Sequence, residues 1–401
     1  MVKHILIFSH AMELGGAERA LLGLLENVDY SRYQVDLFLM RHSGELLDFI
    51  PRKVNLLPEI SDYANMAIPI GQAIRNRKYA VVFGRLLAKM MAVIKIPMLG
   101  VHSENGIELE YSHKYTVSRM PTIGFGEYDL AISFLTPHYY VAQKVKARNK
   151  IAWVHTDYSM IKVDVKSELK MWNSYSHIVS ISESVSERFL KVFPSLRKKI
   201  ILVENIIPVR SIRKQALEFS VKTEMPNDGS IKILSIGRFC TAKNFDNVPD
   251  ICRKIIQGGL NVKWYLIGFG SDERLIKNRI IESNVENEVI ILGKKTNPYP
   301  YINACDIYIQ PSRYEGNSIA VHEAQVLGKP VVITNYSTAF SQLVNGVDGI
   351  IVPMENNECA SSLIDILKNE ELQKSIIRNQ INKDYSKAEG LQKIYDLFCE
   401  R

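Results

Sequence analysis

The sequence predicts an α/β protein of two domains, each built around a parallel β-sheet. The chain has 401 residues, a length that favours two domains over one at about 100 to 200 residues per domain. Hydrophobic residues make up 46% of the chain and charged residues 23%, which excludes a disordered chain and a small disulfide-stapled protein. Short β-branched runs followed by amphipathic stretches recur in both halves. This alternation is typical of strand-helix units in parallel sheets.

The predicted strands form two series along the chain. The first series is expected at residues 4–8, 34–40, 129–134, 150–154, 177–181 and 200–203. The second series is expected at residues 232–236, 262–267, 289–292, 306–310, 330–334 and 349–352. Helix-compatible segments or turns separate the strands in both series. The same pattern therefore occurs once in each predicted domain.

A polar segment lies between the two series of strands. Residues 208–230 show little strand periodicity and contain the turn-forming run Pro226-Asn227-Asp228-Gly229, which is typical of a linker or hinge. We therefore place the boundary near residue 206 and expect domains at 1–205 and 206–384.

The end of the chain is predicted to be helical. Residues 372–401 carry an apolar stripe that includes Leu391, Ile394 and Tyr395. We expect residues 385–401 to form a helix that crosses back to the first domain.

The positive charge of the chain is concentrated in its first half. The net charge is +7, and residues 1–200 hold 26 basic and 19 acidic side chains, whereas residues 201–401 hold 24 of each. Residues 51–100 alone carry eight basic residues and two acidic ones. Such an excess suits an anionic surface, for example a lipid leaflet, a nucleic acid or a phosphorylated substrate. A solvated basic face is an equally good explanation for any single residue.

Cysteine usage and hydropathy predict a protein of the cytoplasm. The five cysteines are odd in number, widely spaced and form no C-x-x-C pair, as expected for reduced thiols: Cys240, Cys252, Cys305, Cys359 and Cys399. The apolar run at the N-terminus is too short for a signal peptide, and no run of about 20 apolar residues could span a bilayer. We therefore expect an intracellular location.

The most informative segment follows the predicted strand at 306–310. It runs Tyr314-Glu315-Gly316-Asn317-Ser318-Ile319-Ala320-Val321-His322-Glu323-Ala324, a small-residue turn that leads into a helix expected to begin near Ser318. Asn317 or Ser318 would cap this helix, and its N-terminal N–H groups would form a phosphate site. Glu315 lies at the lip of the turn and Glu323 about one turn into the helix, so both could accept hydrogen bonds from sugar or ribose hydroxyls. Taken alone, Glu323 could equally be an exposed helix residue.

A second polar segment follows the predicted strand at 232–236. Gly237 ends the strand, Arg238 comes next at the carboxyl edge of the sheet, and Lys243 is expected to open the following helix. Ligands of open α/β sheets bind at this edge. A lysine beside the positive end of a helix dipole is unfavourable unless an anion lies nearby. Arg238 and Lys243 therefore suit a pyrophosphate, and a surface salt-bridge pair is the competing explanation.

Three further features lie at the ends of predicted strands. Gly15 and Gly16 follow the first strand and would let the backbone approach a ligand closely, although a plain tight turn explains them too. Gly268-Phe269-Gly270 is another strand-to-helix turn that decides nothing on its own. His155 ends the strand at 150–154, where hydrogen bonding, proton transfer and a structural role are all open.

Several common site motifs are absent from the sequence. There is no D-x-D carboxylate pair and no pair of histidines at metal-ligand spacing, so neither a metal nor a cofactor is expected. There is also no Walker loop, no G-x-S-x-G nucleophile turn and no G-x-G-x-x-G dinucleotide motif.

Taken in order, these motifs resemble a known enzyme family. Gly15-Gly16-Ala17-Glu18, Gly237-Arg238 to Lys243, Gly268-Phe269-Gly270 and the Glu315 to Glu323 segment resemble the retaining, nucleotide-sugar-dependent glycosyltransferases of family 4. Asn297-Pro298-Tyr299 and residues 346–353 resemble the same family, and residues 153–157 look like enzymes of bacterial surface-polysaccharide assembly. The resemblance implies the GT-B fold, in which two Rossmann-like, doubly wound domains face each other across a cleft. The first domain would bind the acceptor and the second the nucleotide sugar.

The resemblance also implies which residues hold the donor diphosphate. Arg238 and Lys243 would bind it, and Gly15 and Gly16 would approach it from the opposite domain. Fixed cations aimed at a departing diphosphate stabilise the transition state more than the ground state and can replace a metal.

Other residues are assigned by resemblance to the sugar and the nucleoside. Glu315 and His155 would contact the donor sugar, and Glu323 would bind the ribose. Lys294 would lie near the base. The backbone near the sugar and phosphate would be that of Asn317, Ser318 and Ile319.

A basic and apolar segment in the first half suggests contact with a membrane. Residues 81–95 are predicted to form a helix rich in Leu and Met, with Arg85, Lys89 and Lys95 along one flank. Such a helix could lie on an anionic membrane and meet a lipid-linked acceptor. We therefore expect a peripheral contact through residues 75–95, while a core role for the apolar side is equally open.

Together these observations predict a metal-independent retaining glycosyltransferase. It would transfer a hexose or N-acetylhexosamine from a nucleotide-diphosphate sugar, expected to be a UDP-sugar, to a glycan or lipid-linked acceptor in cell-surface polysaccharide synthesis. No nucleic-acid partner is expected. The expected location is the cytoplasm, with peripheral attachment to the inner face of the plasma membrane. The alternatives are a non-catalytic glycan- or membrane-binding protein on the same scaffold and an NAD-dependent dehydrogenase.

Overall fold

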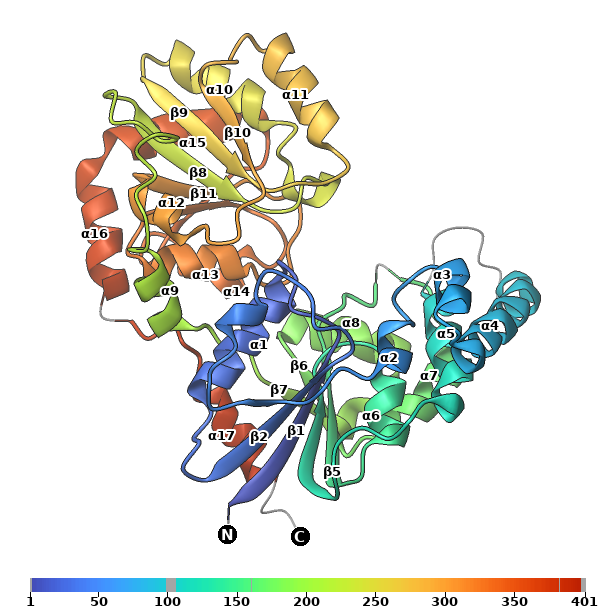
Figure 1. Ribbon diagram of the computed structural model, residues 1–401. Helices are drawn as coiled ribbons and strands as arrows, with labels where there is room; N and C mark the ends of the chain where they lie inside the picture. The colour runs from blue at the N-terminus through green and yellow to red at the C-terminus, as the bar shows by residue number, and fades with distance from the viewer. Residues whose placement is uncertain (1, 99–105, 160, 382, 398–401) are drawn as a thin grey trace. The chain divides into compact units, whose positions relative to one another are not determined.

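A computed structural model describes residues 2–98, 106–159, 161–381 and 383–397 (Figure 1). The chain divides into two compact units. The first unit comprises Met1–Ile206 and Lys387–Arg401, and the second comprises Ile207–Ser386. The boundary between the units thus falls one residue after the expected domain end at 205.

The first unit is built on a seven-stranded parallel sheet. Its order is β3-β2-β1-β4-β5-β6-β7, and every pair of neighbours is parallel. The strands are β1 (Lys3–Ser9), β2 (Tyr33–Leu39), β3 (Asn55–Leu56), β4 (Tyr128–Ser133), β5 (Ala147–Val154), β6 (His177–Ser180) and β7 (Ile200–Leu202). The short edge strand β3 is absent from the predicted series, because a two-residue strand leaves no hydrophobic pattern to detect.

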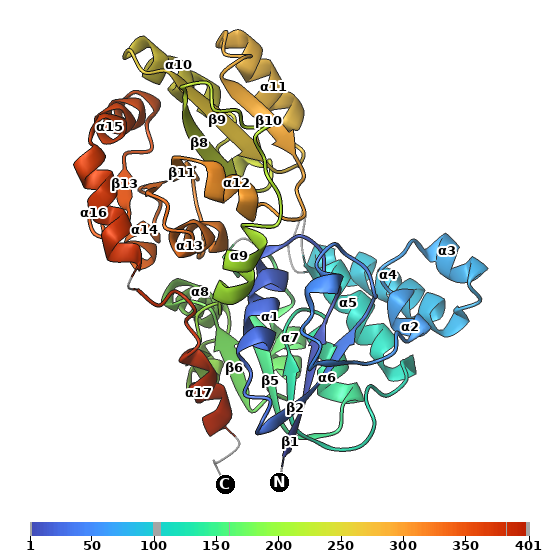
Figure 2. The same ribbon diagram turned by 60° about the vertical axis from the view of Figure 1, so that its left-hand side comes forward.

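Helices connect the strands of the first unit (Figure 2). The α-helices are α1 (Gly16–Asn27), α2 (Ser61–Ala64), α3 (Ile70–Arg75), α4 (Tyr79–Met98), α5 (Ile107–Thr116), α6 (His138–Lys144), α7 (Val165–Trp172), α8 (Glu183–Val192) and α17 (Gly390–Asp396). Three 3₁₀ helices lie at η1 (Leu47–Phe49), η2 (Val117–Arg119) and η3 (Pro194–Lys199).

The last helix of the chain packs on the first unit. The ring of Tyr395 in α17 stacks on that of Tyr33 with centroids 4.4 Å apart, and Asn149 donates a hydrogen bond to the carbonyl of Leu397 at 3.3 Å. The continuous helix expected from residue 372 is wrong, since α16 ends at Ile381 and α17 begins at Gly390.

The second unit repeats the architecture with six parallel strands. Their order is β10-β9-β8-β11-β12-β13. The strands are β8 (Ile231–Ile236), β9 (Val262–Ile267), β10 (Val289–Gly293), β11 (Ile307–Gln310), β12 (Val331–Thr334) and β13 (Ile350–Val352). Both sheets have the doubly wound strand order, so the predicted α/β fold with two Rossmann-like domains is confirmed.

The helices of the second unit include one in the expected linker. They are α9 (Val209–Gln215), α10 (Val248–Gln257), α11 (Glu273–Glu282), α12 (Tyr299–Ala304), α13 (Ile319–Val326), α14 (Ala339–Gln342), α15 (Asn356–Lys368) and α16 (Glu370–Ile381), with a 3₁₀ turn, η4, at Thr241–Lys243. The α9 side chain of Ile212 is fully buried, and Asn297 donates to the carbonyl of Gln215 at 3.0 Å. Residues 208–230 therefore do not form a simple linker, because α9 is anchored to its own unit.

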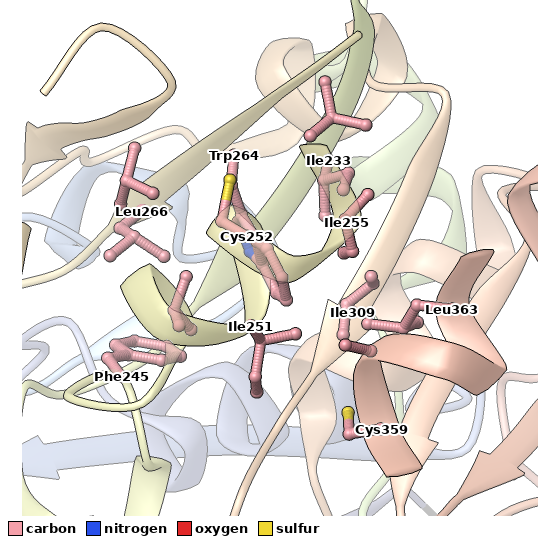
Figure 3. Close-up of a cluster of buried hydrophobic side chains, with 14 of the residues drawn as sticks. Ile233, Phe245, Ile251, Cys252, Ile255, Trp264, Leu266, Ile309, Cys359 and Leu363 are labelled. Atoms are coloured by element: carbon pink, nitrogen blue, oxygen red, sulfur yellow. The ribbon is translucent and has the colours of Figure 1, made fainter. Parts of the chain in front are cut away.

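The core of the second unit lies between the sheet and helices α10 and α15 (Figure 3). Helix α10 buries Ile251, Cys252 and Ile255, which lie on one helical face, against Trp264 of β9. The indole N–H of Trp264 donates to the hydroxyl of Ser235 at 2.9 Å, so its polar atom is not left unpaired in the core. Burying each large apolar side chain contributes about 1.5 to 3 kcal/mol, and the resulting rigid sheet fixes the loops at its carboxyl edge.

The four described cysteines are free thiols, and Cys399 lies outside the described residues. Burial raises the pKa of Cys252, Cys305 and Cys359 to about 12, which makes these three thiols unreactive.

Candidate active site

The topology of the second unit brings two of the predicted motifs together. Strands β8 and β11 are neighbours at the point where the strand order reverses. Ligands of doubly wound sheets bind beside this switch point, at the carboxyl ends of the strands. Arg238 follows β8 and Glu315 follows β11, and the amide of Arg313 donates to the carbonyl of Ala242 at 2.8 Å. The two loops therefore form one connected surface.

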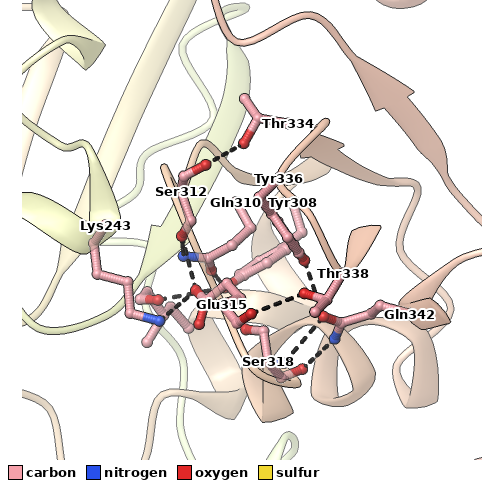
Figure 4. Close-up of polar contacts among 11 residues, drawn as sticks. Lys243, Tyr308, Gln310, Ser312, Glu315, Ser318, Thr334, Tyr336, Thr338 and Gln342 are labelled. Atoms are coloured by element: carbon pink, nitrogen blue, oxygen red, sulfur yellow. Dashed lines mark hydrogen bonds and ion pairs between the residues drawn. The ribbon is translucent and has the colours of Figure 1, made fainter. Parts of the chain in front are cut away.

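An ion pair joins the two loops at this surface (Figure 4). The ammonium of Lys243 donates to Oε1 of Glu315, and the Ser312 hydroxyl donates to the same oxygen at 2.7 Å. The side chains are 21% exposed for Lys243 and 10% for Glu315, so the pair is largely buried but not sealed from solvent. The prediction placed these two residues in one site, and the structure brings them into direct contact.

Lys243 does not open a helix as expected. It ends the 3₁₀ turn Thr241–Lys243, Asn244 follows with φ of 59°, and α10 begins only at Val248. The argument from an unfavourable helix dipole therefore fails, and Glu315 is the anion beside this lysine. Arg238 is exposed, and it forms no hydrogen bond or ion pair with any of the described residues.

A network of hydrogen bonds between buried polar side chains leads to Glu315. The Tyr308 hydroxyl donates to Oε1 of Gln310 at 2.6 Å, and Nε2 of Gln310 donates to the Ser312 hydroxyl at 2.9 Å. Tyr308 and Gln310 lie two residues apart on one face of β11. Burial and the nearby carboxylates of Glu323 and Glu315 raise the pKa of Tyr308 well above its usual value. Sequence analysis missed this network, although polar residues at alternate positions of an apolar strand were a usable signal.

Helix α14 fixes the loop that carries Glu315. The Thr338 hydroxyl donates to the carbonyl of Glu315 at 2.8 Å. Gln342 accepts from the Ser318 amide at 3.0 Å and donates to the Ser318 carbonyl at 2.6 Å (Figure 4). The Tyr336 hydroxyl donates to the same Gln342 oxygen at 2.9 Å. The expected side-chain cap is therefore wrong: Ser318 is the N-cap residue of α13, but its own side chain caps nothing, and its amide is held by Gln342.

Glu323 lies on the buried side of α13. It is 2% exposed, and its Oε1 accepts from the Tyr299 hydroxyl at 2.8 Å. The explanation of Glu323 as an exposed helix residue is therefore wrong. Asn317 at the start of the helix lies 3.0 Å from Nε2 of His322, and Nδ1 of this imidazole lies 3.0 Å from Gln325, so the turn is tied to the helix interior.

The Gly268-Phe269-Gly270 turn packs directly against the Arg238 loop. A Cβ on Gly268 would lie 1.9 Å from the carbonyl oxygen of Gly237, and one on Gly270 would lie 2.2 Å from that of Phe239. Only glycine permits this approach. The amide of Phe239 also donates to the carbonyl of Phe269 at 2.8 Å. The turn therefore has a definite structural role, which its sequence alone did not reveal.

Lys294 lies beside the same turn. It follows β10, and its ammonium lies 5.0 Å from the centroid of the Phe269 ring. The Phe269 side chain is 45% exposed, so an aromatic face and a cation occur together at this edge.

In the first unit, the two predicted glycines lie at the start of α1. Gly15 is the N-cap residue and Gly16 is the first residue of the helix. The preceding segment rests on the loop after β2, since the amide of Met12 donates to the carbonyl of Ser43 at 2.9 Å. Gly44 in that loop has φ of 109°, and a Cβ there would lie 2.2 Å from the Met12 backbone. The segment that leads into Gly15 and Gly16 is thus held in place by the loop after β2.

His155 directly follows β5 in the first unit. It lines a cavity of about 30 Å³ together with Trp153, His138 and Trp172. Its Nε2 is buried without a hydrogen-bond partner in the described structure, and its ring lies 4.7 Å from that of Phe134. Burial lowers the pKa of His155 to about 3, which keeps the imidazole neutral at pH 7. A hydrogen-bonding role therefore fits this residue better than proton transfer.

Two searches of the described residues bear on metal binding and on membrane insertion. They contain no group of three or more His, Cys, Asp or Glu side chains arranged to hold a metal ion. No helix among residues 2–98, 106–159, 161–381 and 383–397 is long and apolar enough to cross a membrane.

Comparisons with known proteins agree with the predicted family. Residues 218–383 match the sequence model of the glycosyl transferases group 1. An uncharacterized glycosyltransferase of Methanocaldococcus jannaschii, MJ1178, is 24% identical over 66% of this chain and 81% of its own length. The capsular polysaccharide biosynthesis glycosyltransferase CapM of Staphylococcus aureus is also 24% identical, over 56% of this chain and 62% of its own.

Solved glycosyltransferase structures share the fold along the whole chain. HepE of Anabaena, solved in complex with UDP-glucose, aligns with 99% of this chain and 99% of its own at 15% identity and a TM-score of 0.67. A Staphylococcus aureus TarM variant, solved with fondaparinux, α-GlcNAc-glycerol and UDP, aligns with 100% of both chains at 14% identity and a TM-score of 0.67. The chain therefore has the GT-B fold of these structures, and residues 218–383 match the glycosyl transferases group 1.

Proposed function

We propose that this protein transfers a hexose or N-acetylhexosamine from a UDP-sugar to a glycan or lipid-linked acceptor in cell-surface polysaccharide synthesis. One observation carries the proposal: Lys243 and Glu315 meet at the switch point of the second sheet, with Arg238 exposed in the same loop. The names of similar proteins support the assignment, since CapM is named for capsular polysaccharide biosynthesis. A Campylobacter jejuni relative, 26% identical over 54% of this chain, is named for transfer to a diphospho-undecaprenol-linked sugar.

In this proposal the two cations hold the donor diphosphate. Arg238 supplies a guanidinium that can bind phosphate oxygens in a bidentate manner, and Lys243 supplies a point charge. Lys243 is held by Glu315, so its ammonium is already positioned before a ligand binds. No resident metal is part of the proposal, because these two cations neutralise the charge that develops on the leaving group.

The remaining residues of the second unit orient the donor. Glu315 accepts hydrogen bonds from the sugar, and Glu323 with Tyr299 forms the ribose site. The backbone of 317–319 faces the sugar and phosphate, and Lys294 with Phe269 provides the surface for the base. Carboxylates suit this task because they accept hydrogen bonds from hydroxyl groups at several angles.

We assign the proposed residues of the first unit to the same donor. Gly15 and Gly16 approach the diphosphate through their backbone, which the absence of side chains permits. His155 donates or accepts a hydrogen bond with the sugar as a neutral imidazole, in keeping with its lowered pKa.

The proposed reaction retains the configuration of the sugar. The bond between the anomeric carbon and the phosphate oxygen breaks, and a bond to the acceptor oxygen forms on the same face. The acceptor proton passes to the departing diphosphate, so the enzyme needs no separate base. Glu315 contributes by positioning the sugar and not by covalent chemistry.

A ligand screen followed by a transfer assay tests the proposal. We expect UDP and one UDP-sugar, but not NADH, to raise the unfolding temperature of the protein. The stabilising UDP-sugar should then be consumed, with the anomeric configuration of the product read by NMR. Stabilisation by NADH alone would support the dehydrogenase alternative. Binding of the UDP-sugar without hydrolysis or transfer to any acceptor would support a non-catalytic protein.

A further inference from the structure

Helix α4 of the first unit exposes a continuous apolar stripe, which we call the α4 stripe. Successive members are separated by one, three or four residues, so all lie on one face of the helix. Their side chains are between 51% and 75% exposed: Tyr79, Phe83, Leu86, Met90, Val93 and Ile94. Scattered exposed apolar residues are normal, but six on one face of one helix form a contiguous patch of the kind that marks an interaction site.

The opposite face of α4 fixes the orientation of the stripe. Gly84, Ala88 and Ala92 are buried, and the two alanines pack against Ile107 and Tyr111 of α5. A Cβ on Gly84 would lie 2.6 Å from the Thr116 hydroxyl, so the two helices are in close contact. The helix thus buries Val81 and Val82 together with these three small residues, while the six large apolar side chains of the stripe stay outside the core. The alternative that the apolar side of this helix packs in the core does not account for the large exposed residues of the α4 stripe.

The charge around the α4 stripe is entirely positive within this stretch of sequence. Residues 63–98 contain no Asp or Glu and six basic residues. Lys78 pairs with Asp62 and Arg85 bonds to backbone carbonyls, but the other four are exposed: Arg75, Arg77, Lys89 and Lys95. A further cation, Arg119, lies with its guanidinium 4.8 Å from the centroid of the Phe83 ring. Cations thus border the apolar patch.

We propose that the α4 stripe docks on an anionic lipid membrane, with the helix lying in the plane of the interface. An apolar face bordered by Lys and Arg matches a surface that offers acyl chains below and negative headgroups above. A second copy of this chain is a poorer partner, because it would bring the same exposed cations against residues 63–98, which contain no Asp or Glu to pair with them. This surface goes beyond the proposed transfer reaction and does not depend on it.

Vesicle co-sedimentation of the full chain tests the proposal. We expect binding to vesicles of phosphatidylcholine mixed with phosphatidylglycerol, weaker binding to phosphatidylcholine alone, and weakening by salt. The double variant Leu86→Gln with Met90→Gln should lower the partition coefficient at least about tenfold, because it removes apolar contact at the centre of the stripe. Arg75→Glu with Lys89→Glu should abolish the preference for anionic lipid while leaving the apolar residues in place.

A matched control uses exposed apolar residues of the other unit. Leu217 and Ile281 are 78% and 61% exposed, and Leu217→Gln with Ile281→Gln should bind vesicles as the unchanged protein does. All variants should keep their unfolding temperature and their affinity for UDP measured without vesicles, so failure of docking and failure of the donor site are distinguishable. The proposal is overturned if the unchanged protein ignores anionic vesicles or if the Leu86 and Met90 variant still binds them. A solution dimer that this variant dissociates, without vesicle binding, would assign the stripe to a second copy.

Discussion

Lys243 and Glu315 form an ion pair across 72 residues of sequence. Each follows one of two neighbouring strands, β8 and β11, so the pair joins the strand ends at the switch point of the sheet. The Ser312 hydroxyl donates to the same carboxylate oxygen at 2.7 Å. The position of the Glu315 carboxylate is therefore fixed by two donors. Removing either member of such a half-buried pair leaves the other without its charge partner.

This arrangement separates the expected effects of two substitutions. Glu315→Ala should lower kcat at least about 100-fold and leave the Kd for UDP within about threefold, since Glu315 is assigned to the sugar and the released Lys243 ammonium can still pair with the diphosphate. Arg238→Ala should lower kcat and also weaken UDP about tenfold or more, since a lost charged hydrogen bond costs about 1.5 to 3 kcal/mol. Steady-state kinetics and calorimetric titration with UDP measure both quantities.

Arg274→Ala is the control for Arg238, because Arg274 is an exposed arginine of the same unit on α11. It should leave kcat and the UDP affinity unchanged. Full sugar transfer by Glu315→Ala would show that the donor site has been assigned to the wrong residues.

Gln342 should matter for both stability and turnover. Replacement by Leu removes the two bonds to the Ser318 backbone and the bond from Tyr336. Leaving buried backbone groups unpaired costs about 1 to 3 kcal/mol each, so we expect a loss of about 3 kcal/mol or more in the unfolding free energy. Because the same contacts position the loop of Glu315, kcat should fall more than the KM for the donor changes.

The exposed Gln257, at the end of α10, provides the control for Gln342. Gln257→Leu should change the unfolding free energy in urea by less than about 0.5 kcal/mol. Equal effects of the two substitutions would mean that the bonds between α14 and the Glu315 loop contribute nothing.

The sheets could be predicted because most of the strands contain a buried run of apolar residues. Strand β9 was predicted at 262–267 and spans Val262–Ile267. Two elements were not predicted because they show no clear hydrophobic pattern. Strand β3 has only two residues, and α9 presents a single buried stripe within a polar segment. Helix propensity alone did not show that residues 383–389 separate α16 from α17.

The candidate site could be predicted only in part, for a related reason. Charged residues at strand ends mark a ligand edge, and this marker led to the prediction of Arg238, Lys243 and Glu315 as site residues. The residues that hold this loop in place are neutral, and their hydrogen bonds to it cannot be predicted from sequence spacing. Gln342 reaches Ser318 across 24 positions, and only the fold brings them together. The predicted cap at Ser318 was wrong: its side chain makes no cap hydrogen bond, and Gln342 holds its backbone instead.

Gly268 should be intolerant of any side chain. In Gly268→Ala the new methyl group would lie 1.9 Å from the Gly237 carbonyl oxygen, so the loop that carries Arg238 would have to move. We expect a loss of several kcal/mol in the unfolding free energy and a weaker affinity for UDP. Gly259→Ala is the control, since Gly259 has φ of +85° with no neighbouring atom within 4 Å. It should cost only the backbone penalty of about 1 to 2 kcal/mol, with the UDP affinity retained.

The contribution of Glu168 to the stability of the first unit should fall as the pH rises through a defined window. Glu168 is 6% exposed, and its Oε2 accepts from the Tyr158 hydroxyl at 2.9 Å and the Trp172 indole at 3.3 Å. Burial raises the pKa of this carboxyl from 4.5 to about 7. Between these values the folded protein keeps a proton that the unfolded chain has released. The contribution of Glu168 to the unfolding free energy therefore decreases with rising pH, by an amount of the order of 3 kcal/mol. Buried histidines such as His155 contribute with the opposite sign, because their pKa is lowered in the folded protein.

Glu168→Gln tests this pH dependence directly. The amide oxygen still accepts from Tyr158 and Trp172, but the group no longer titrates, so the Tm of Glu168→Gln measured by calorimetry should rise relative to that of the unchanged protein from about pH 4.5 to 7. Glu110 and His155 are buried in both proteins, so this difference isolates the contribution of Glu168. Glu187→Gln, on the exposed side of α8, should keep the full dependence. An identical pH profile for Glu168→Gln and the unchanged protein would show that Glu168 is ionised in the folded state.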